Sequence, residues 1–179
     1  MCGDRQRWES NDGSGEWWSA PPHDLVRTTR SLGDLGPAGL WLVEDSFGPD
    51  EAMTSAVAFS SGARVLELDG PDAWVDLCRR YPLEVTATRR HDWYRTTGRD
   101  SRWLLPDWAA VALDADAVHL TVAGYLTTAG RALDVTDGVA TVLAGWDPDV
   151  TVWLNDTAIE RTQSARWALD ADDMWGRLA

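Results

Sequence analysis

The sequence predicts an α+β domain in which strands and short helices mix in the first half and strands dominate the second. Three observations favour this class. Apolar and polar residues alternate over 116–122, as in a half-buried strand. Asp137-Gly138 joins two strand-like runs, which is a strong hairpin signal. From Pro71 onward, apolar residues recur at the spacing of one helix face.

The N-terminal residues 1–22 are expected to form a disordered tail, followed by one α+β domain over 23–179. The tail is polar, rich in Gly and Ser, and ends in two prolines. Trp17-Trp18 interrupts it, and two alternatives stay open: the pair docks onto the domain, or it forms a short partner-binding motif. A chain of 179 residues is long enough to bury a substantial core.

The elements of the first half follow in chain order. They are a strand at 25–30, a Gly/Pro turn at 33–39, an apolar run at 40–43, a helix at 49–59, a strand at 64–68, a helix from Pro71 to the residue before Pro82, and strand-like alternation at 83–87. In the second of these helices Trp74, Leu77 and Cys78 form the buried stripe. Residues 89–102 contain Thr96-Thr97-Gly98 and are interpreted as a loop.

The second half is expected to open with a short helix after Pro106-Asp107. An antiparallel β-meander of about four strands follows, at 116–122, 131–136, 139–144 and 150–154. The spacing of Trp167, Met174 and Leu178 then predicts a terminal amphipathic helix.

Positive charge is concentrated in one place. Seven of the sixteen Arg fall within residues 79–102 and face only three acidic residues there, so this window is +4 in a chain of net charge −13. Such focusing predicts an anion-recognition patch. Its expected ligand-binding residues are Arg89, Arg90, Trp93, Tyr94 and Arg95. A guanidinium forks onto phosphate or carboxylate, and aromatic rings stack on planar groups.

A structural role for the same residues is the competing interpretation. Arg79 and Arg80 suit the end of a helix, where cations are favoured. The other Arg would then pair with the protein's own carboxylates.

Three residues are weak catalytic candidates. His91 stands beside Asp92, and a carboxylate can orient an imidazole that acts as a base. His119 lies mid-strand, on the face opposite Val118 and Leu120. Each also has a structural interpretation: a surface loop for His91, a hydrogen-bonded core position for His119.

Composition excludes several function classes. The net charge of −13 argues against general nucleic-acid binding. The chain has no Lys, which excludes Schiff-base chemistry and a P-loop lysine. The three His and two Cys show no metal-ligand spacing, so no metal and no cofactor are expected. Cys78 is expected to be an inert buried thiol. With no secretory signal or membrane span, a cytoplasmic location is expected.

Two functions remain, beside a purely structural part in a larger assembly. The first is a recognition domain that binds an anionic small molecule or an acidic protein through the Arg/Trp/Tyr patch. The second is an enzyme acting on a nucleotide or phosphorylated substrate, with His91 or His119 as acid/base. One version of the second is an NAD-using transferase with Arg27 or Arg30 on an early strand and Ser46 after the next. Such an enzyme also needs a carboxylate that holds the ribose or activates the acceptor. Only Asp134 and Asp149 stand at late strand ends, and the lack of a Glu there counts against this version. Oligomeric state and ligand identity are left open.

Overall fold

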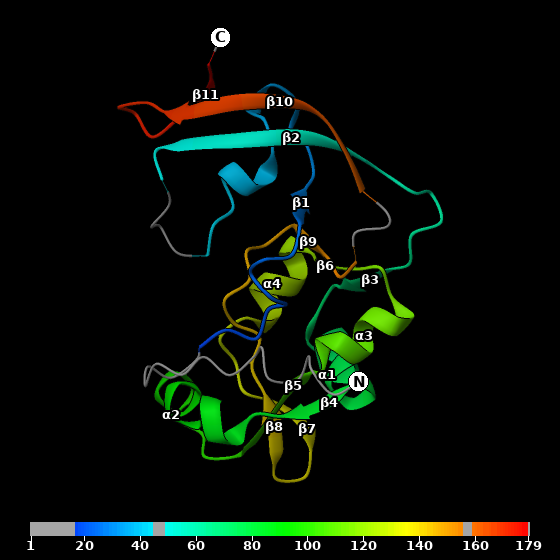
Figure 1. Ribbon diagram of the computed structural model, residues 1–179. Coiled ribbons are helices and arrows are strands. Elements are labelled where there is room, and N and C mark those ends of the chain that lie inside the picture. The colour runs from blue at the N-terminus through cyan, green and yellow to red at the C-terminus, as the bar shows by residue number, and fades with distance from the viewer. Residues whose placement is uncertain (1–16, 45–48, 156–158, 179) are drawn as a thin grey trace.

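The α+β class is confirmed. The computed structural model describes residues 17–44, 49–155 and 159–178, and these form four α-helices and eleven strands in three sheets (Figure 1). Within them, no helix is long and apolar enough to cross a membrane. The predicted loss of order in residues 1–16 lies outside the described residues.

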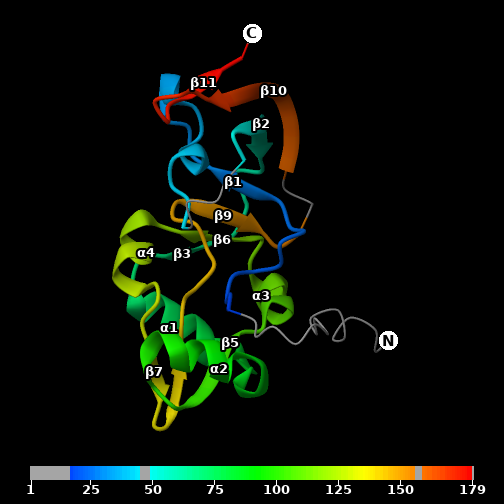
Figure 2. The same cartoon turned by 90° about the vertical axis from the view of Figure 1, so that its left-hand side faces the viewer.

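A central sheet joins distant parts of the chain. Its strand order is β1 (Arg27–Thr29), β9 (Val150–Trp153), β6 (Ala117–Leu120), β3 (Val65–Leu68). β3 and β6 run parallel, and the other pairs are antiparallel. Val118, Leu120 and Val152 are fully buried on one face. Helices α1 (Pro71–Arg80), α3 (Trp108–Asp114) and α4 (Val122–Thr128) lie on one side of this sheet. A third sheet, formed by residues 51–59, 159–169 and 175–177, lies on the other side (Figures 1 and 2).

The second sheet has the order β4 (Pro82–Glu84), β5 (Arg102–Pro106), β8 (Val139–Thr141), β7 (Leu133–Thr136). The predicted hairpin at Asp137-Gly138 is present, since β7 and β8 pair across it. The turn is not of type I′, the type that an Asp-Gly pair favours. Gly138 has φ +70, but Asp137 is not among the described residues of positive φ, and a type I′ turn needs both.

The predicted C-terminal meander is therefore wrong in its connections. β6 and β9 belong to the central sheet, whereas β7 and β8 belong to the second. The run 116–122 also ends earlier than expected, because Thr121 caps α4 by accepting a hydrogen bond from the Gly124 N–H at 2.8 Å.

The third sheet overturns two predicted helices. β2 (Glu51–Phe59) occupies the stretch expected as a helix at 49–59. The end of β10 (Ile159–Leu169), a turn and β11 (Trp175–Arg177) take the place of the expected terminal helix. β10 pairs antiparallel with both neighbours. The carboxylate of Asp170 accepts hydrogen bonds from the Asp172 and Met174 N–H groups. This turn breaks the helical spacing and folds β11 back onto β10.

The helices after Gly70 and after Pro106 agree with the prediction. Pro71 begins α1, and Trp74, Leu77 and Cys78 are buried. Asp107 caps α3 through two backbone N–H groups. In contrast, the predicted loop at 89–102 is wrong, because most of it belongs to helix α2 (Thr86–Thr97) and to β5. Gly98 ends α2 in the left-handed conformation, with φ +68.

Tryptophan fills the core between these layers. Trp74, Trp93 and Trp103 are fully buried, and Trp108 and Trp146 nearly so. Four of these rings meet in two edge-on pairs, Trp93 with Trp103 and Trp108 with Trp146. Most of the described Trp residues are thus buried and serve to pack the core.

Residues 17–22 belong to the folded body, so the predicted tail boundary at residue 22 is too late. Ser19 is buried and exchanges backbone and side-chain hydrogen bonds with Ala144. Its carbonyl accepts from Trp108 Nε1. Of the two alternatives for Trp17-Trp18, the structure supports docking: Trp17 packs against the core, and a Cβ on Gly145 would lie 2.4 Å from Trp18 Cβ.

Candidate functional site

Helix α2 divides the predicted anion patch between two sides. Arg89 and Trp93, four residues apart, point into the body and are buried. Arg90, His91, Tyr94 and Arg95 are exposed on the other side. Because 3.6 residues make one turn, Arg90 lies next to Tyr94 and His91 next to Arg95. We call these four residues the α2 face.

Arg89 and Trp93 have structural partners. Arg89 Nε donates to the Trp18 carbonyl at 3.1 Å, and Trp93 Nε1 donates to the Trp17 carbonyl at 2.8 Å. Burial lowers the pKa of Arg89 to about 10, against the opposing attraction of Asp92. These two side chains hold the segment 17–18 against α2, so neither offers a surface for a ligand.

Most other Arg of the window 79–102 are paired with nearby carboxylates. The pairs are Arg79–Asp76, Arg90–Asp100, Arg99–Asp134 and Arg102–Glu84. The pKa of Glu84 is lowered by its hydrogen bond from Arg102, and that of Asp134 by its hydrogen bond from Arg99. Arg80 lies over the Tyr81 ring at 5.2 Å.

Arg95 is the exception. It is exposed and has no hydrogen bond or ion pair to any residue that the structure describes. Tyr94, on the same exposed side of the helix and one turn from Arg90, is 52% exposed. A free guanidinium can take an anion, and an exposed phenol ring can stack on a planar group.

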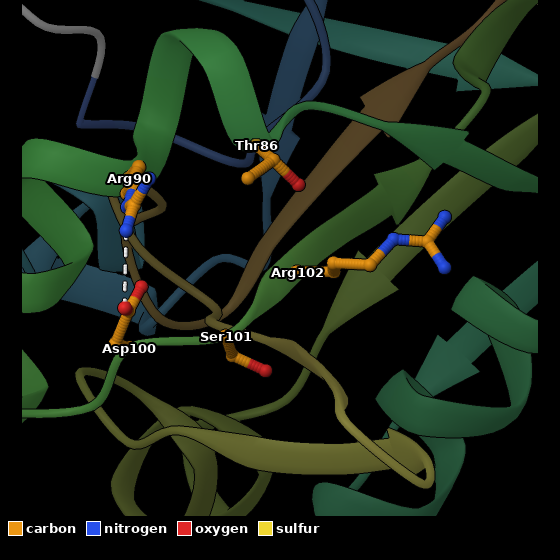
Figure 3. Close-up of a pocket in the computed structure, with 5 residues that line it drawn as sticks. All are labelled: Thr86, Arg90, Asp100, Ser101 and Arg102. Carbon is orange, nitrogen blue, oxygen red and sulfur yellow. Dashed lines mark hydrogen bonds and ion pairs between the residues drawn. The ribbon is translucent and has the colours of Figure 1, made fainter.

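A surface depression of about 260 Å³ adjoins the start of α2 (Figure 3). It is lined by Thr86, Arg90, Asp100, Ser101 and Arg102. Arg90 points toward Asp100, whereas Arg102 extends away from them (Figure 3). The Thr86 and Ser101 hydroxyls donate to Glu84 and to the Gly138 carbonyl. Arg90 is thus the residue shared by the depression and the α2 face.

His91 and Asp92 do not form a catalytic pair. A helix turns successive residues by about 100°, and the two side chains differ in burial, His91 being exposed and Asp92 half-buried. Asp92 Oδ2 is buried and finds no hydrogen-bond partner in the described ranges.

His119 lies in the central sheet, away from α2. Its ring Nδ1 is 2.9 Å from Thr151 Oγ1, and the imidazole is half-buried. As predicted, its face is opposite that of Val118 and Leu120. Glu67 is its register partner on the parallel strand β3. Sequence reasoning missed Glu67, because no local signal shows which strands are neighbours.

Of the residues considered for an NAD-using transferase, the structure brings Arg30 and Asp149 together but gives Arg27 other partners. Arg27 donates to the carbonyls of Pro21, Pro22, His23 and Leu25, and burial lowers its pKa. Arg30 instead pairs with the buried Asp149 at 3.0 Å. Ser46 lies outside the described residues.

Two further chemistries have structural answers. In the described ranges, no three His, Cys, Asp or Glu side chains are grouped to hold a metal ion. Cys78 is buried 3.3 Å from Thr141 Oγ1, and burial raises the pKa of its thiol to about 12. That thiol is inert at neutral pH.

No family model, no curated protein and no solved structure matches this chain. The function must therefore be argued from its own residues.

Proposed function

We propose that the protein is a recognition module that binds an anionic ligand or acidic partner through the α2 face. Two observations carry this proposal: Arg95 is exposed and lacks an internal partner in the described part of the chain, and the exposed Tyr94 ring lies one helical turn from Arg90. Arg90 adds a second cation, whose pair with Asp100 is exposed on both sides. Exposed pairs of this kind exchange partners at little cost.

The chemistry favours an anion attached to a flat group. Arg95 supplies two or more parallel donors, and Tyr94 supplies a ring of matching size. The net charge of −13 around this face repels extended polyanions, so a compact anion or a short acidic segment is the favoured partner.

Phenyl phosphate and inorganic phosphate test this proposal when titrated separately and followed by amide chemical shifts at low salt. We expect phenyl phosphate to bind more tightly, with shifts centred on residues 90–95, because only it can stack on Tyr94. Arg95→Glu should weaken its binding at least about tenfold, which corresponds to about 1.4 kcal/mol. Added salt should weaken it too, since exposed charges are screened over about 8 Å at physiological ionic strength.

Arg177→Glu is the matched control, because Arg177 is also exposed, on the distant strand β11. Its binding should equal that of the unmodified protein. Equal losses in the two variants would reduce the effect to net charge, and the absence of shifts on α2 at millimolar ligand would refute the proposal.

A second candidate function is an enzyme acting on a nucleotide or phosphorylated substrate. The hydrogen bond of His119 to Thr151 favours His119 over His91 as its acid/base, since it fixes the ring orientation. His91 has no such partner among the described residues. Loss of turnover in His119→Gln, with α2 variants unaffected, would distinguish this function from recognition at the α2 face.

A further inference from the structure

A row of polar side chains crosses the central sheet on the face opposite the core. Register places Glu67, His119, Thr151 and Thr28 side by side on β3, β6, β9 and β1. Side chains that are paired in register point to the same face. None of the four is fully buried, and Glu67 is exposed. On β3, β6 and β9 the residues of the opposite face are all apolar, so the polar row marks a change of character across the same strands.

An aromatic group lies on one side of this row, along β9. Two residues from Thr151 along β9 comes Trp153, whose ring lies 5.6 Å from that of Phe59. Trp153 is buried, but Phe59 remains 62% exposed. Phe59 is thus held by one ring contact while much of its surface is free to stack on a planar ligand.

A cation lies on the opposite side of the row from the aromatic group. Two residues from Thr151 in the opposite direction comes Asp149, and two residues beyond Thr28 comes Arg30. The closest contact of the Arg30–Asp149 ion pair is from Nε, at 3.0 Å, and neither terminal nitrogen of Arg30 makes a hydrogen bond within the described ranges. The guanidinium is 62% exposed, whereas the carboxylate is almost buried. Asp149 therefore orients Arg30 and leaves its two terminal N–H groups for an anion.

The backbone supports this arrangement. Asp149 has φ +64, a left-handed conformation that is uncommon for residues other than glycine. Its carboxylate also accepts a hydrogen bond from Thr29 Oγ1 at 3.2 Å. A conformation of this kind is kept when the surrounding contacts enforce it, and it is common at ligand sites.

We infer that this face of the central sheet binds a nucleoside monophosphate. The parts of the ligand match groups around this row: the base on Phe59, the ribose hydroxyls on His119 with Glu67 beyond it, and the phosphate on Arg30. Strands advance about 3.3 Å per residue, so the four residues from Trp153 to Asp149 span about 13 Å. That span fits an extended nucleoside monophosphate. Carboxylates commonly accept hydrogen bonds from ribose hydroxyls.

This inference deepens the second candidate function by naming its substrate class and site, and it does not depend on the α2 face. It concerns binding alone, so it can hold whether or not His119 performs a reaction.

Adenosine 5′-monophosphate is the probe, with ribose 5-phosphate and inorganic phosphate as partial ligands. Amide shifts on β1, β6 and β9 should accompany binding, and affinity should fall in that order of ligands. Phe59→Ala should weaken the nucleotide at least tenfold but leave ribose 5-phosphate unchanged. Arg30→Gln should weaken both.

Arg177→Gln is the control and should change neither affinity, since Arg177 lies at the far end of the third sheet from Phe59. Glu67→Gln provides a second test in case Arg30→Gln unfolds the protein, because Glu67 is exposed; it should weaken the nucleotide but not inorganic phosphate. If Phe59→Ala and Glu67→Gln both bound the nucleotide as tightly as the unmodified protein, the inference would be overturned. Shifts confined to residues 90–95 would overturn it too, and would support the α2 face instead.

Discussion

Arg89 and Arg95 show that the surroundings of an arginine decide whether its charge is available. They are six residues apart on one helix, yet Arg89 is 6% exposed and donates to a backbone carbonyl, whereas Arg95 is exposed. The buried Arg89 holds the N-terminal segment against α2, whereas the exposed Arg95 is a candidate ligand contact. Among the five ligand-binding residues predicted from sequence, the same division separates Trp93 from Tyr94.

Gly124 is a residue at which only a hydrogen atom fits. A Cβ there would lie 2.1 Å from the Leu68 carbonyl oxygen, so β3 and α4 are in direct backbone contact. We expect Gly124→Ala to lower the free energy of unfolding by about 1–3 kcal/mol, as overpacking does. Denaturant unfolding measures this. Gly62→Ala is the control, since the nearest side-chain atom there is 3.8 Å away; a loss as large in that variant would contradict the explanation.

Asp116 gives the protein an acid-sensitive contact. Hydrogen bonds from the Arg64 side chain and backbone, and from Asn155, hold its pKa well below the usual range. A carboxyl whose folded pKa is depressed stabilises the protein above its unfolded pKa of about 3.9, and that stability is lost as pH falls further. Asp116→Asn should lower the Tm at pH 7 and flatten the fall of Tm below pH 4. Parallel Tm curves for the two proteins would refute this role.

At the scale of elements, local signals predicted α1, α3, β3 and the β7–β8 hairpin. The helices and the hairpin have local markers: a proline or a cap at the start of each helix, and Asp-Gly at the hairpin. The elements missed were those decided by distant partners. β2 and β10 pair through residues at least 100 positions apart. Helix α2 buries only Arg89 and Trp93, too few for an apolar stripe.

The candidate sites divide in the same way. The concentration of Arg and the candidacy of His119 follow from sequence alone. The α2 face needed the helical phase of residues 86–97, and the row beside His119 needed the strand order. Neither is written locally in the chain.

The hairpin offers a sharp test of turn geometry. Gly138 has positive φ, so Gly138→Ala should cost about 1–2 kcal/mol of stability. Asp137 does not, so Asp137→Ala should change stability by less than about 0.5 kcal/mol. Thermal unfolding of the two variants checks this. Equal losses of stability in the two variants would indicate that both residues have positive φ, as in a type I′ turn.

For the whole molecule, burial is uneven among the three sheets. Among the described side chains of the third sheet, only Trp167 is buried, under Gly36 and with its Nε1 donating to Thr54. The central sheet buries several residues completely. Regions with few buried apolar groups open locally at lower free energy than the global unfolding.

Hydrogen exchange should therefore separate the sheets. We expect the amides of 53–57 and 165–169 to exchange at least about tenfold faster than those of 118–120 and 150–153, the difference expected of a less stable unit. Trp167→Ala should accelerate exchange in the third sheet while leaving the central sheet unchanged. Uniform acceleration throughout the protein would instead make the three sheets one cooperative unit.

The edge strand β1 has a consequence for how the protein is made. Its residue Thr28 accepts a hydrogen bond from Trp153, 125 positions later in the chain. At a synthesis rate of 5–20 residues per second, β1 waits about 6–25 s on the ribosome before its partner strand exists. Ser19 waits similarly for Ala144. During that interval α1 and the antiparallel pair β4–β5 can already form, since their partners lie within about one helix length along the chain. The N-terminal segment is then the last part of the central body to be fastened, and a nascent-chain chaperone would have its longest access there.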